Sequence, residues 1–354
     1  MDTDMSDLAL TIFEDWHFGV NVLAITFNSL MIYLCLYKTP KAIKSYSILM
    51  LNFALSDLGA SLTDFFVCQR IIPAGWTIGF ISSGPCQYIS RFSCFLGYSL
   101  NLHFLSHSLI SLLVSFAYRY YILFNASPRR LILIIILFVV YLPSGFEWVY
   151  LAFFGYDDPE HIEHIVHEMF PHYYLENKTI TGISNIFENI PALYTIAWQT
   201  MPVSPIYICI LILRVKILKQ LQKVADKMSS ATQDMHRSLL WALSLQALLP
   251  LFFLLAVICY ALGQLGIYNH PALEYMTFSV SLPIPLVSPL ISIYFVRPYR
   301  AFVCRCFCRV RVRIVNAITP SSIMGESNRT LTDPSRWHKG TEFQSGTVNP
   351  SSMG

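Results

Sequence analysis

Long apolar stretches separated by short polar segments dominate the chain. Seven of them reach about 20 residues, the length of helix that crosses about 30 Å of hydrocarbon at a rise of 1.5 Å per residue. This pattern predicts seven membrane-spanning helices. The spans are Phe18–Tyr37, Tyr46–Val67, Phe92–Leu123, Leu131–Phe154, Ile190–Leu213, Ser238–Leu262 and Ala272–Val296.

Prolines interrupt two of these spans. A membrane helix tolerates such kinks because its neighbours bond the carbonyl groups that proline leaves free. No internal repeat relates one half of the chain to the other, which argues against a transporter. The prolines are Pro191, Pro202 and Pro205 in the fifth span, and Pro283, Pro285 and Pro289 in the seventh.

Composition supports the membrane interpretation. Of the 354 residues, 55% are hydrophobic and 13% are charged, and the mean hydropathy is +0.51. A soluble domain carries about 25% charged residues. The 9 cysteines are too sparse for a disulfide scaffold. These values exclude a cytosolic enzyme, a disordered protein and a small disulfide-rich secreted domain.

Lysine and arginine are concentrated on one side of the predicted spans. All but three of the 24 fall there, the exceptions being Arg70, Arg91 and Lys178. Positive charge marks the inner side of a membrane protein, so we expect the N-terminus outside and the C-terminus inside. Residues 1–17 are then an extracellular N-terminus, 18–296 the bundle, 297–315 a basic juxtamembrane segment and 316–354 a disordered cytoplasmic tail.

Individual residues within the spans resemble the landmarks of rhodopsin-like receptors. They occur in the order and at the depths found in those receptors. The resemblance implies an all-α membrane protein, a seven-helix bundle with a short amphipathic helix after the seventh span. The landmarks are Asn28, Leu55-Ser56-Asp57-Leu58, Tyr118-Arg119-Tyr120, Pro250 and Ser288-Pro289.

Longer motifs narrow the resemblance to nematode serpentine chemoreceptors of class delta. The similarity extends from about Phe18 to Arg300. It implies a sensory-neuron receptor for an external chemical, in the plasma membrane of a sensory cilium, that signals through a heterotrimeric G protein. The motifs are Thr39-Pro40-Lys41, Arg70-Ile71-Ile72-Pro73, Gly84-Pro85-Cys86, Ser115 to Tyr121, and Ser288 to Arg300.

Asp57 is an ionisable residue deep in the second span. Such a group is costly in a membrane unless it faces polar partners or water. Asn28, Ser108 and Ser288 are the expected partners. By resemblance, the four residues form a polar hub that rearranges on activation, with or without bound sodium. The alternative is a protonated aspartate that only joins neighbouring helices.

The third span carries the other candidate residues. At its inner end, the resemblance implies that Arg119, flanked by Tyr118 and Tyr120, engages the G protein; the alternative is an arginine that marks the membrane interface. Tyr118 replaces the acid found there in many rhodopsin-like receptors. In the outer half, Tyr98, Asn101 and Leu105 are the candidate ligand-binding residues, and ordinary helix packing is the alternative.

Several positions are candidates for covalent modification. Asn177 is a glycosylation sequon in the second outer loop. Juxtamembrane cysteines among basic residues indicate palmitoylation and contact with membrane lipids, with free thiols as the alternative. These are Cys304, Cys306 and Cys308. Cys68, Cys86 and Cys94 lie near the outer face and allow three pairings or three free thiols. The chain has no cysteine between Cys94 and Cys209, so the disulfide that joins the third helix to the second outer loop in rhodopsin-like receptors cannot form.

The expected partners are therefore a heterotrimeric G protein, an unknown small molecule and membrane lipids, with arrestin and a receptor kinase as further candidates. We expect no cofactor, no metal, no nucleic acid and no enzymatic activity. A zinc site at His161 and His164 is a weak alternative, because the sequence offers no second tight pair of ligands. A seven-helix ligand-gated channel and a receptor for an internal peptide or small molecule are the alternative functions.

Overall fold

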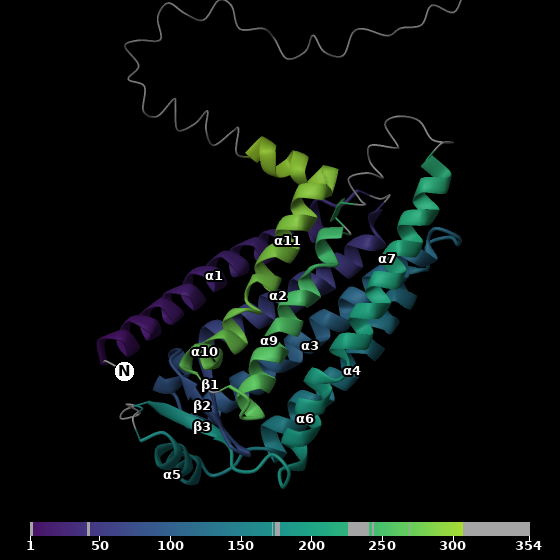
Figure 1. Cartoon of the computed structure of the whole chain (residues 1–354). Helices are drawn as coiled ribbons and strands as arrows, with labels where there is room; N and C mark the ends of the chain where they lie inside the picture. The colour runs from purple at the N-terminus through teal and green to yellow at the C-terminus, as the bar shows by residue number, and fades with distance from the viewer. Residues whose placement is uncertain are drawn as a thin grey trace, which may run out of the picture. The chain divides into compact units, whose positions relative to one another are not determined.

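The computed structural model describes residues 3–40, 43–171, 173, 178–225, 241–242, 244–268 and 270–306. It divides the chain into two units, Met1–Phe302 and Val303–Gly354. Nearly all described residues belong to the first unit. This unit is a bundle of long helices that carries a small β-sheet at one end (Figure 1).

The first four long helices agree closely with the predicted spans, except at the start of the chain. α2 (Tyr46–Val67), α3 (Arg91–Tyr121) and α4 (Arg130–Phe154) begin and end within two residues of the prediction. α1 (Thr3–Tyr37) begins well before Phe18. Most of the segment expected as an extracellular N-terminus is therefore helical.

The early start of α1 follows from a stripe of buried residues along one face. Residues three and four apart lie on the same face of a helix. The stripe begins before the apolar run, at Phe13 and His17, which are 4% and 1% exposed. It then continues through Val20, Ala24, Asn28, Met31 and Leu34.

Prolines divide two of the predicted spans into pairs of helices. α6 (Ile190–Thr200) and α7 (Val203–Ala225) are separated at Pro202. α10 (Pro271–Ser279) and α11 (Pro283–Phe295) are separated before Pro283. Proline lacks the N–H that the helix needs and clashes with the preceding turn, and the predicted interruptions are confirmed at Pro202 and Pro283. The other four prolines do not break a helix: Pro191 lies in the first turn of α6, Pro205 lies within α7, and Pro285 and Pro289 lie within α11. Between these pairs lies α9 (Leu249–Gln264).

Six helical segments of the described chain are long and apolar enough to cross a membrane. They contain α1, α3, α4, the α6–α7 pair, α9 and the α10–α11 pair. α2 does not meet this measure because it carries Asn52, Asp57 and Asp64. Its aspartates are buried among neighbouring helices. The polar groups therefore face protein, as a membrane helix requires.

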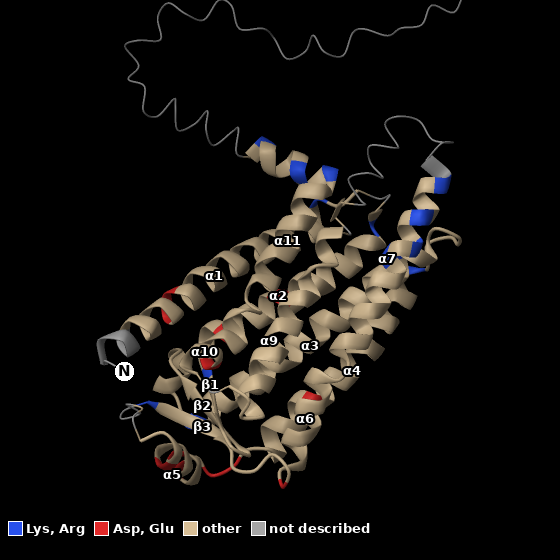
Figure 2. Ribbon diagram, viewed as in Figure 1, with Lys and Arg blue, Asp and Glu red and all other residues tan. Residues whose placement is uncertain are grey.

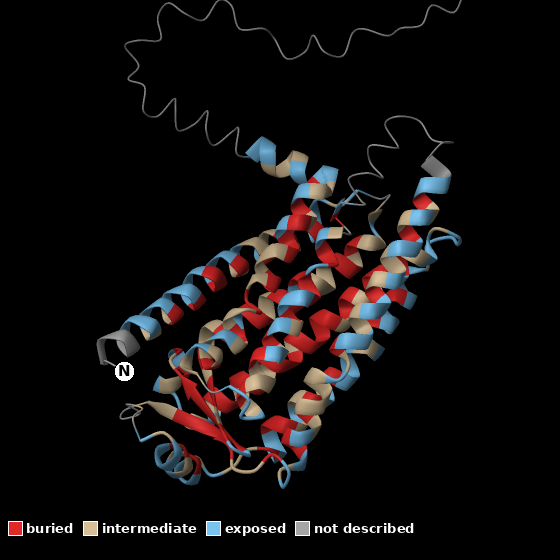
Figure 3. Ribbon diagram, in the orientation of Figure 1, coloured by how far each residue is buried: buried red, intermediate tan, exposed pale blue. Residues whose placement is uncertain are grey.

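The outward faces of the bundle are apolar. Figure 3 shows buried positions toward the inside and exposed positions along the outer side of α4. Leu131, Ile135 and Phe138 on α4 are all more than half exposed. Their spacing places them on one helix face. An apolar exterior of this kind suits contact with lipid hydrocarbon.

Three strands form an antiparallel sheet at one end of the bundle. They are β1 (Gln69–Ala74), β2 (Thr77–Ser82) and β3 (Thr179–Ile183), in the order β1-β2-β3. Gly75 has φ +65° at the first loop position of the β1–β2 hairpin, where glycine favours a two-residue turn. The sequence analysis predicted no strand, so the sheet is an addition to the helical fold.

A short amphipathic helix covers the sheet. α5 (Pro159–Met169) buries Ile162 and Val166 completely. These two side chains pack with Ile72 and Ile180 of the sheet. The His164 side chain is 71% exposed on the other face. Residues 160–170 therefore form a solvated cover.

A disulfide fixes the beginning of α3. Cys86 and Cys94 are bonded, which joins a short 3-10 helix (Pro85–Tyr88) to the first turn of α3. Cys68 is a free, buried thiol at the end of α2. Of the three pairings that the sequence left open, the structure selects this one.

Charge is segregated along the bundle. Figure 2 shows Lys and Arg around the end of α7, and Asp and Glu around α5 at the other end of the first unit. Beyond α11, residues 297–306 are helical, as predicted after the seventh span. Within this segment, the Tyr299 side chain is fully buried and its hydroxyl lies 2.6 Å from the Thr39 hydroxyl.

Candidate functional site

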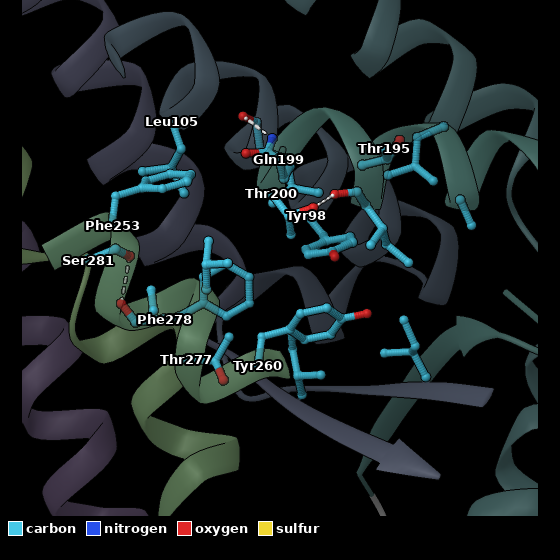
Figure 4. Close-up of a pocket in the computed structure, with 18 of the residues that line it drawn as sticks. Tyr98, Leu105, Thr195, Gln199, Thr200, Phe253, Tyr260, Thr277, Phe278 and Ser281 are labelled. Atoms are coloured by element: carbon cyan, nitrogen blue, oxygen red, sulfur yellow. Dashed lines mark hydrogen bonds between the residues drawn. The ribbon is translucent and has the colours of Figure 1, made fainter. Parts of the chain in front are cut away.

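A cavity lies inside the bundle beneath the sheet (Figure 4). Its volume, taken as the space open to the centre of a water-sized sphere, is about 90 Å³, several times the roughly 10–15 Å³ that one water molecule requires. α3, α6, α9 and α10 form its walls, and Ile71, Ile78 and Ile183 of the three strands contribute to its lining. The sheet therefore covers one end of the cavity.

Two of the three predicted ligand-binding residues line this cavity. Tyr98 and Leu105 are both at its surface. Asn101 is buried on α3 but does not line the cavity; its neighbour Leu102 does. The predicted set therefore differs from the observed one by a single residue. Tyr98, Leu102 and Leu105 are spaced four and three residues apart, so they share the helix face that lines the cavity.

The polar residues of the cavity wall come mainly from helices in which no ligand-binding residue was predicted. Thr195 and Gln199 lie on α6, and Tyr260 lies on α9. The Gln199 amide nitrogen donates to the Leu102 carbonyl at 2.9 Å and to a Glu147 carboxylate oxygen at 2.7 Å. Gln199 thus links the cavity wall to a buried acid.

Glu147 is fully buried on α4 and was also missed from the sequence. Its second carboxylate oxygen accepts a hydrogen bond from the Ser106 hydroxyl at 3.0 Å. The sequence does single this residue out, because Glu147 is the one charged residue in the predicted span Leu131–Phe154. An ionisable group inside a membrane helix usually marks a functional position.

The predicted polar hub is assembled in part. The Ser108 hydroxyl donates to Asp57 Oδ1 at 2.9 Å, and Ser288 of α11 is the neighbouring hydroxyl. Asp57 Oδ2 has no hydrogen-bond partner. Asn28 bonds to main chain instead, donating to the Pro285 carbonyl at 2.7 Å. Asn28 therefore joins α1 to α11 and not to the aspartate.

A second, smaller cavity at the hub shares part of its wall with the first cavity. Its volume is about 20 Å³ on the same measure, and both Asp57 and Ser108 line it. Leu105 and Phe253 belong to the walls of both cavities. A displacement of either side chain would therefore change the shape of both cavities.

A second polar cluster lies nearer the sheet and was not predicted. His17 lies 2.8 Å from the Asp64 carboxylate, and Asn21 donates to the same oxygen at 2.6 Å. The other ring nitrogen of His17 lies 3.0 Å from the Ser279 hydroxyl. The cluster joins α1, α2 and α10. The sequence pattern that could have revealed this cluster is the spacing of the two aspartates of α2. Asp64 follows Asp57 by seven residues, or about two helical turns, so both lie on the same helix face.

An ion pair joins β1 to α10, and Tyr173 bonds to the same acid. Arg70 of β1 lies 2.6 Å from Glu274, and the Tyr173 hydroxyl donates to the same carboxylate at 2.8 Å. The guanidinium lies between the rings of Tyr173 and Tyr275, at 4.9 and 4.4 Å. Burial and the Glu274 charge raise the pKa of Tyr173 above its ordinary value, which keeps the phenol a donor.

At the other end of α3, Arg119 is buried and held by α2. It donates to the Tyr46 hydroxyl and lies 4.9 Å from the centre of the Tyr46 ring. Its Nε and Nη1 atoms have no partner. The Tyr118 hydroxyl lies 3.0 Å from Ser127 and does not contact the arginine. Tyr120 packs among α3 and α7 side chains.

The candidate modification sites are only partly described. Cys304 and Cys306 are exposed thiols. Asn177 and Cys308 lie outside the described residues. Within the described part of the chain, no group of three or more His, Cys, Asp or Glu side chains is placed to hold a metal ion.

The arrangement of the helices is that of the rhodopsin fold. The structure is similar to the crystal structure of squid rhodopsin, with a TM-score of 0.58 over 86% of this chain and 87% of that chain. The two sequences are 14% identical, so this likeness defines the fold alone. The class of protein is therefore a multi-pass, rhodopsin-like helical bundle.

Sequence comparison gives the family within this class. The family model described as "Serpentine type 7TM GPCR chemoreceptor Srd" matches residues 13–305. Serpentine receptor class delta-18 of Caenorhabditis elegans is 40% identical over 88% of this chain and 93% of its own. Serpentine receptor class delta-1 of the same organism is 33% identical over 88% and 85%.

The chain belongs to the Srd family of serpentine chemoreceptors. It is a G-protein-coupled-receptor-type membrane protein and not an enzyme. The resemblance to class delta receptors that the motifs indicated is confirmed.

Proposed function

We propose that this protein is a chemosensory receptor. It binds an external small molecule in the cavity lined by Tyr98 and Leu105 and activates a heterotrimeric G protein at the opposite end of the bundle. The observation that carries the proposal is the cavity itself, which lies among helices of the bundle, is covered by the sheet at one end and is lined mainly by apolar side chains with a few polar groups, as small-molecule sites are.

Communication between the two ends runs through Leu105 and Phe253. These side chains separate the ligand cavity from the cavity at Asp57 and Ser108. A ligand that pushes on them changes the packing around the Asp57 carboxyl. The polar hub then responds to occupancy of the cavity above it, whether or not it also holds sodium.

Arg119 is the residue that we assign to G-protein coupling, flanked by Tyr118 and Tyr120. Two of its guanidinium nitrogens have no partner in this state. A buried cation without full hydrogen bonding is costly, so release of the side chain toward an acceptor on a G protein is favourable. Family membership favours this receptor function over a ligand-gated channel.

We place the protein in the plasma membrane of a sensory cilium, with the N-terminus outside. The segregation of basic residues to one end of the bundle supports this orientation. The cilium is what the resemblance to class delta chemoreceptors implies. This orientation assigns the glycosylation sequon at Asn177 to the outer side of the membrane, and the candidate palmitoylation residues Cys304, Cys306 and Cys308 to the inner side. Arrestin and a receptor kinase would act on the same face as the G protein.

The proposal is tested with a panel of external compounds applied to cells that carry a calcium or cyclic-nucleotide reporter. Arg119→Ala should abolish the response while leaving surface expression unchanged. Arg129→Ala is the matched control, because this arginine is exposed beyond the same end of α3. An undiminished response in Arg119→Ala would contradict the coupling role.

Orientation is tested separately with an epitope tag at each terminus. Antibody applied to unpermeabilised cells should reach the N-terminal tag and not the C-terminal tag. The reverse result would contradict the receptor function.

A further inference from the structure

The chemistry of the cavity wall restricts the ligand, and this argument rests on the proposed function. Among the described residues, no Asp, Glu, Lys or Arg lines the cavity. The nearest acid identified above, Glu147, lies behind Gln199 and is occupied by two donors, Gln199 and Ser106. A charged ligand would lose its hydration without gaining an opposite charge at the wall, which is costly.

The Gln199 side chain presents an acceptor that the protein does not use. Its amide nitrogen donates to the Leu102 carbonyl and to Glu147. A carbonyl can only accept, so this bond fixes which end of the amide is the nitrogen. The oxygen, Oε1, is buried and has no partner. It requires a donor.

Two further hydroxyl groups of the lining are also unpartnered. Thr195 Oγ1 and the Tyr260 hydroxyl are buried without a hydrogen bond. Other hydroxyls of the same wall are satisfied by their own helices, since Thr200 donates to the Ile196 carbonyl at 2.7 Å and Ser281 to the Phe278 carbonyl at 2.7 Å. The unpartnered groups are thus particular positions, not a general property of the wall.

Figure 4 shows these groups on different sides of the cavity, with Thr195 and Gln199 on α6 and Tyr260 on α9. A buried polar group without a partner costs about 1–3 kcal/mol. Three such groups around an otherwise apolar cavity indicate that something absent from the protein itself completes them. A hydroxyl suits this wall because it both donates and accepts.

We propose that the cavity binds an uncharged, largely apolar small molecule that carries a hydroxyl or an amide N–H. The donor of the ligand meets Gln199 Oε1, and its acceptor is met by the hydroxyl of Thr195 or Tyr260. The apolar remainder packs against the isoleucine, leucine and phenylalanine side chains of the wall.

The test measures binding to the purified full-length receptor in lipid nanodiscs by thermal shift, without a G protein. The probes are matched sets on one skeleton: octanol, octylamine and octanoate; phenylethanol, phenethylamine and phenylacetate; cyclohexanol, cyclohexylamine and cyclohexanecarboxylate. Ala256→Phe, which fills the cavity from α9, corrects for partitioning into lipid; Ala192→Phe serves if that variant does not fold.

The expected result is that, in at least one set, the alcohol binds about tenfold or more tightly than its amine and its acid, and that the filled variant loses this binding. The proposal is overturned if an amine or acid binds as tightly as the matching alcohol. It is equally overturned if no alcohol binds the wild type better than the filled variant.

A second comparison tests the polar groups. At least one of the variants Thr195→Val and Tyr260→Phe should weaken alcohol binding, by about two- to tenfold for the loss of one hydrogen bond. Thr200→Val, in the same wall but with a satisfied hydroxyl, should change it less than about twofold. The assignment is overturned if neither Thr195→Val nor Tyr260→Phe weakens alcohol binding more than Thr200→Val does.

Binding and signalling fail separately in this design. Alcohol binding without any G-protein response contradicts the proposed function and leaves the ligand class intact. A G-protein response to amines or acids, with no alcohol binding, contradicts the ligand class and leaves the proposed function intact.

Discussion

Removing the Tyr46 hydroxyl should raise signalling in the absence of ligand. In many rhodopsin-like receptors an acid beside the α3 arginine restrains it, and here that position is Tyr118, whose hydroxyl faces Ser127 instead. The restraint comes from α2, because Arg119 donates to the Tyr46 hydroxyl. Tyr46→Phe keeps the aromatic ring against the guanidinium and deletes only the acceptor.

The expected size follows from the contact that is lost. A hydrogen bond to a charged group contributes about 1.5–3 kcal/mol, whereas the cation–π contact, worth about 0.5–2 kcal/mol, remains. If the bond exists only in the resting state, its loss lowers the ratio of resting to active receptor about tenfold or more. A receptor that is about 1% active without ligand would become about 10% active.

The assay compares ligand-free G-protein activation at equal surface expression, with a cyclic-nucleotide or calcium reporter. Tyr121→Phe is the matched control, because it deletes the hydroxyl of an exposed tyrosine at the same end of α3. It should leave ligand-free activity unchanged. Ligand-free activity of Tyr46→Phe at or below the wild-type level would refute the reasoning.

Three further predictions concern the outer part of the molecule. Cys94→Ser removes a cross-link that closes a short loop, and should lower the free energy of unfolding by about 2–3 kcal/mol, measured by thermal denaturation with Cys86→Ser as the equivalent variant. Cys68 should resist maleimide at pH 8 in the folded receptor, because burial and nearby carboxylates raise the pKa of its thiol far above the ordinary value; rapid labelling, read by mass spectrometry, would contradict this. Arg70→Met leaves Glu274 buried without its cation, and should destabilise the outer loops by about 3 kcal/mol or more. Hydrogen exchange that is unchanged in β1 and around residue 173 would argue against that role.

The helices were predictable because the membrane imposes one length and one polarity on them. α2 and α4 match the predicted spans closely since short polar segments flank them on both sides. The start of α1 could not be predicted in this way. Its buried stripe begins among acidic residues, and mean hydropathy does not detect the helical spacing of the apolar ones. Pro202 and Pro283 fixed the breaks in the fifth and seventh spans, since proline acts locally.

The sheet and most of the polar cavity wall required tertiary information. β1 and β3 are five to six residues long and lie far apart in sequence, so their pairing through β2 has no local signal. In the sequence, Gln199 is one polar residue in an apolar span. Its orientation in the cavity wall depends on its hydrogen bond to Glu147 of another helix, which the sequence does not show. Tyr46 lies at a predicted span boundary, where tyrosine is common.

The pairing of β2 with β3 does what a cystine does in many rhodopsin-like receptors, since it ties the first outer loop to the second. The tie consists of peptide groups, which every amino acid supplies. Ile71, Ile78 and Ile183 can therefore be exchanged for other strand-forming residues while the roof stays attached. Substitutions at these three positions would therefore change the lining of the cavity while the backbone pairing that attaches the sheet is kept.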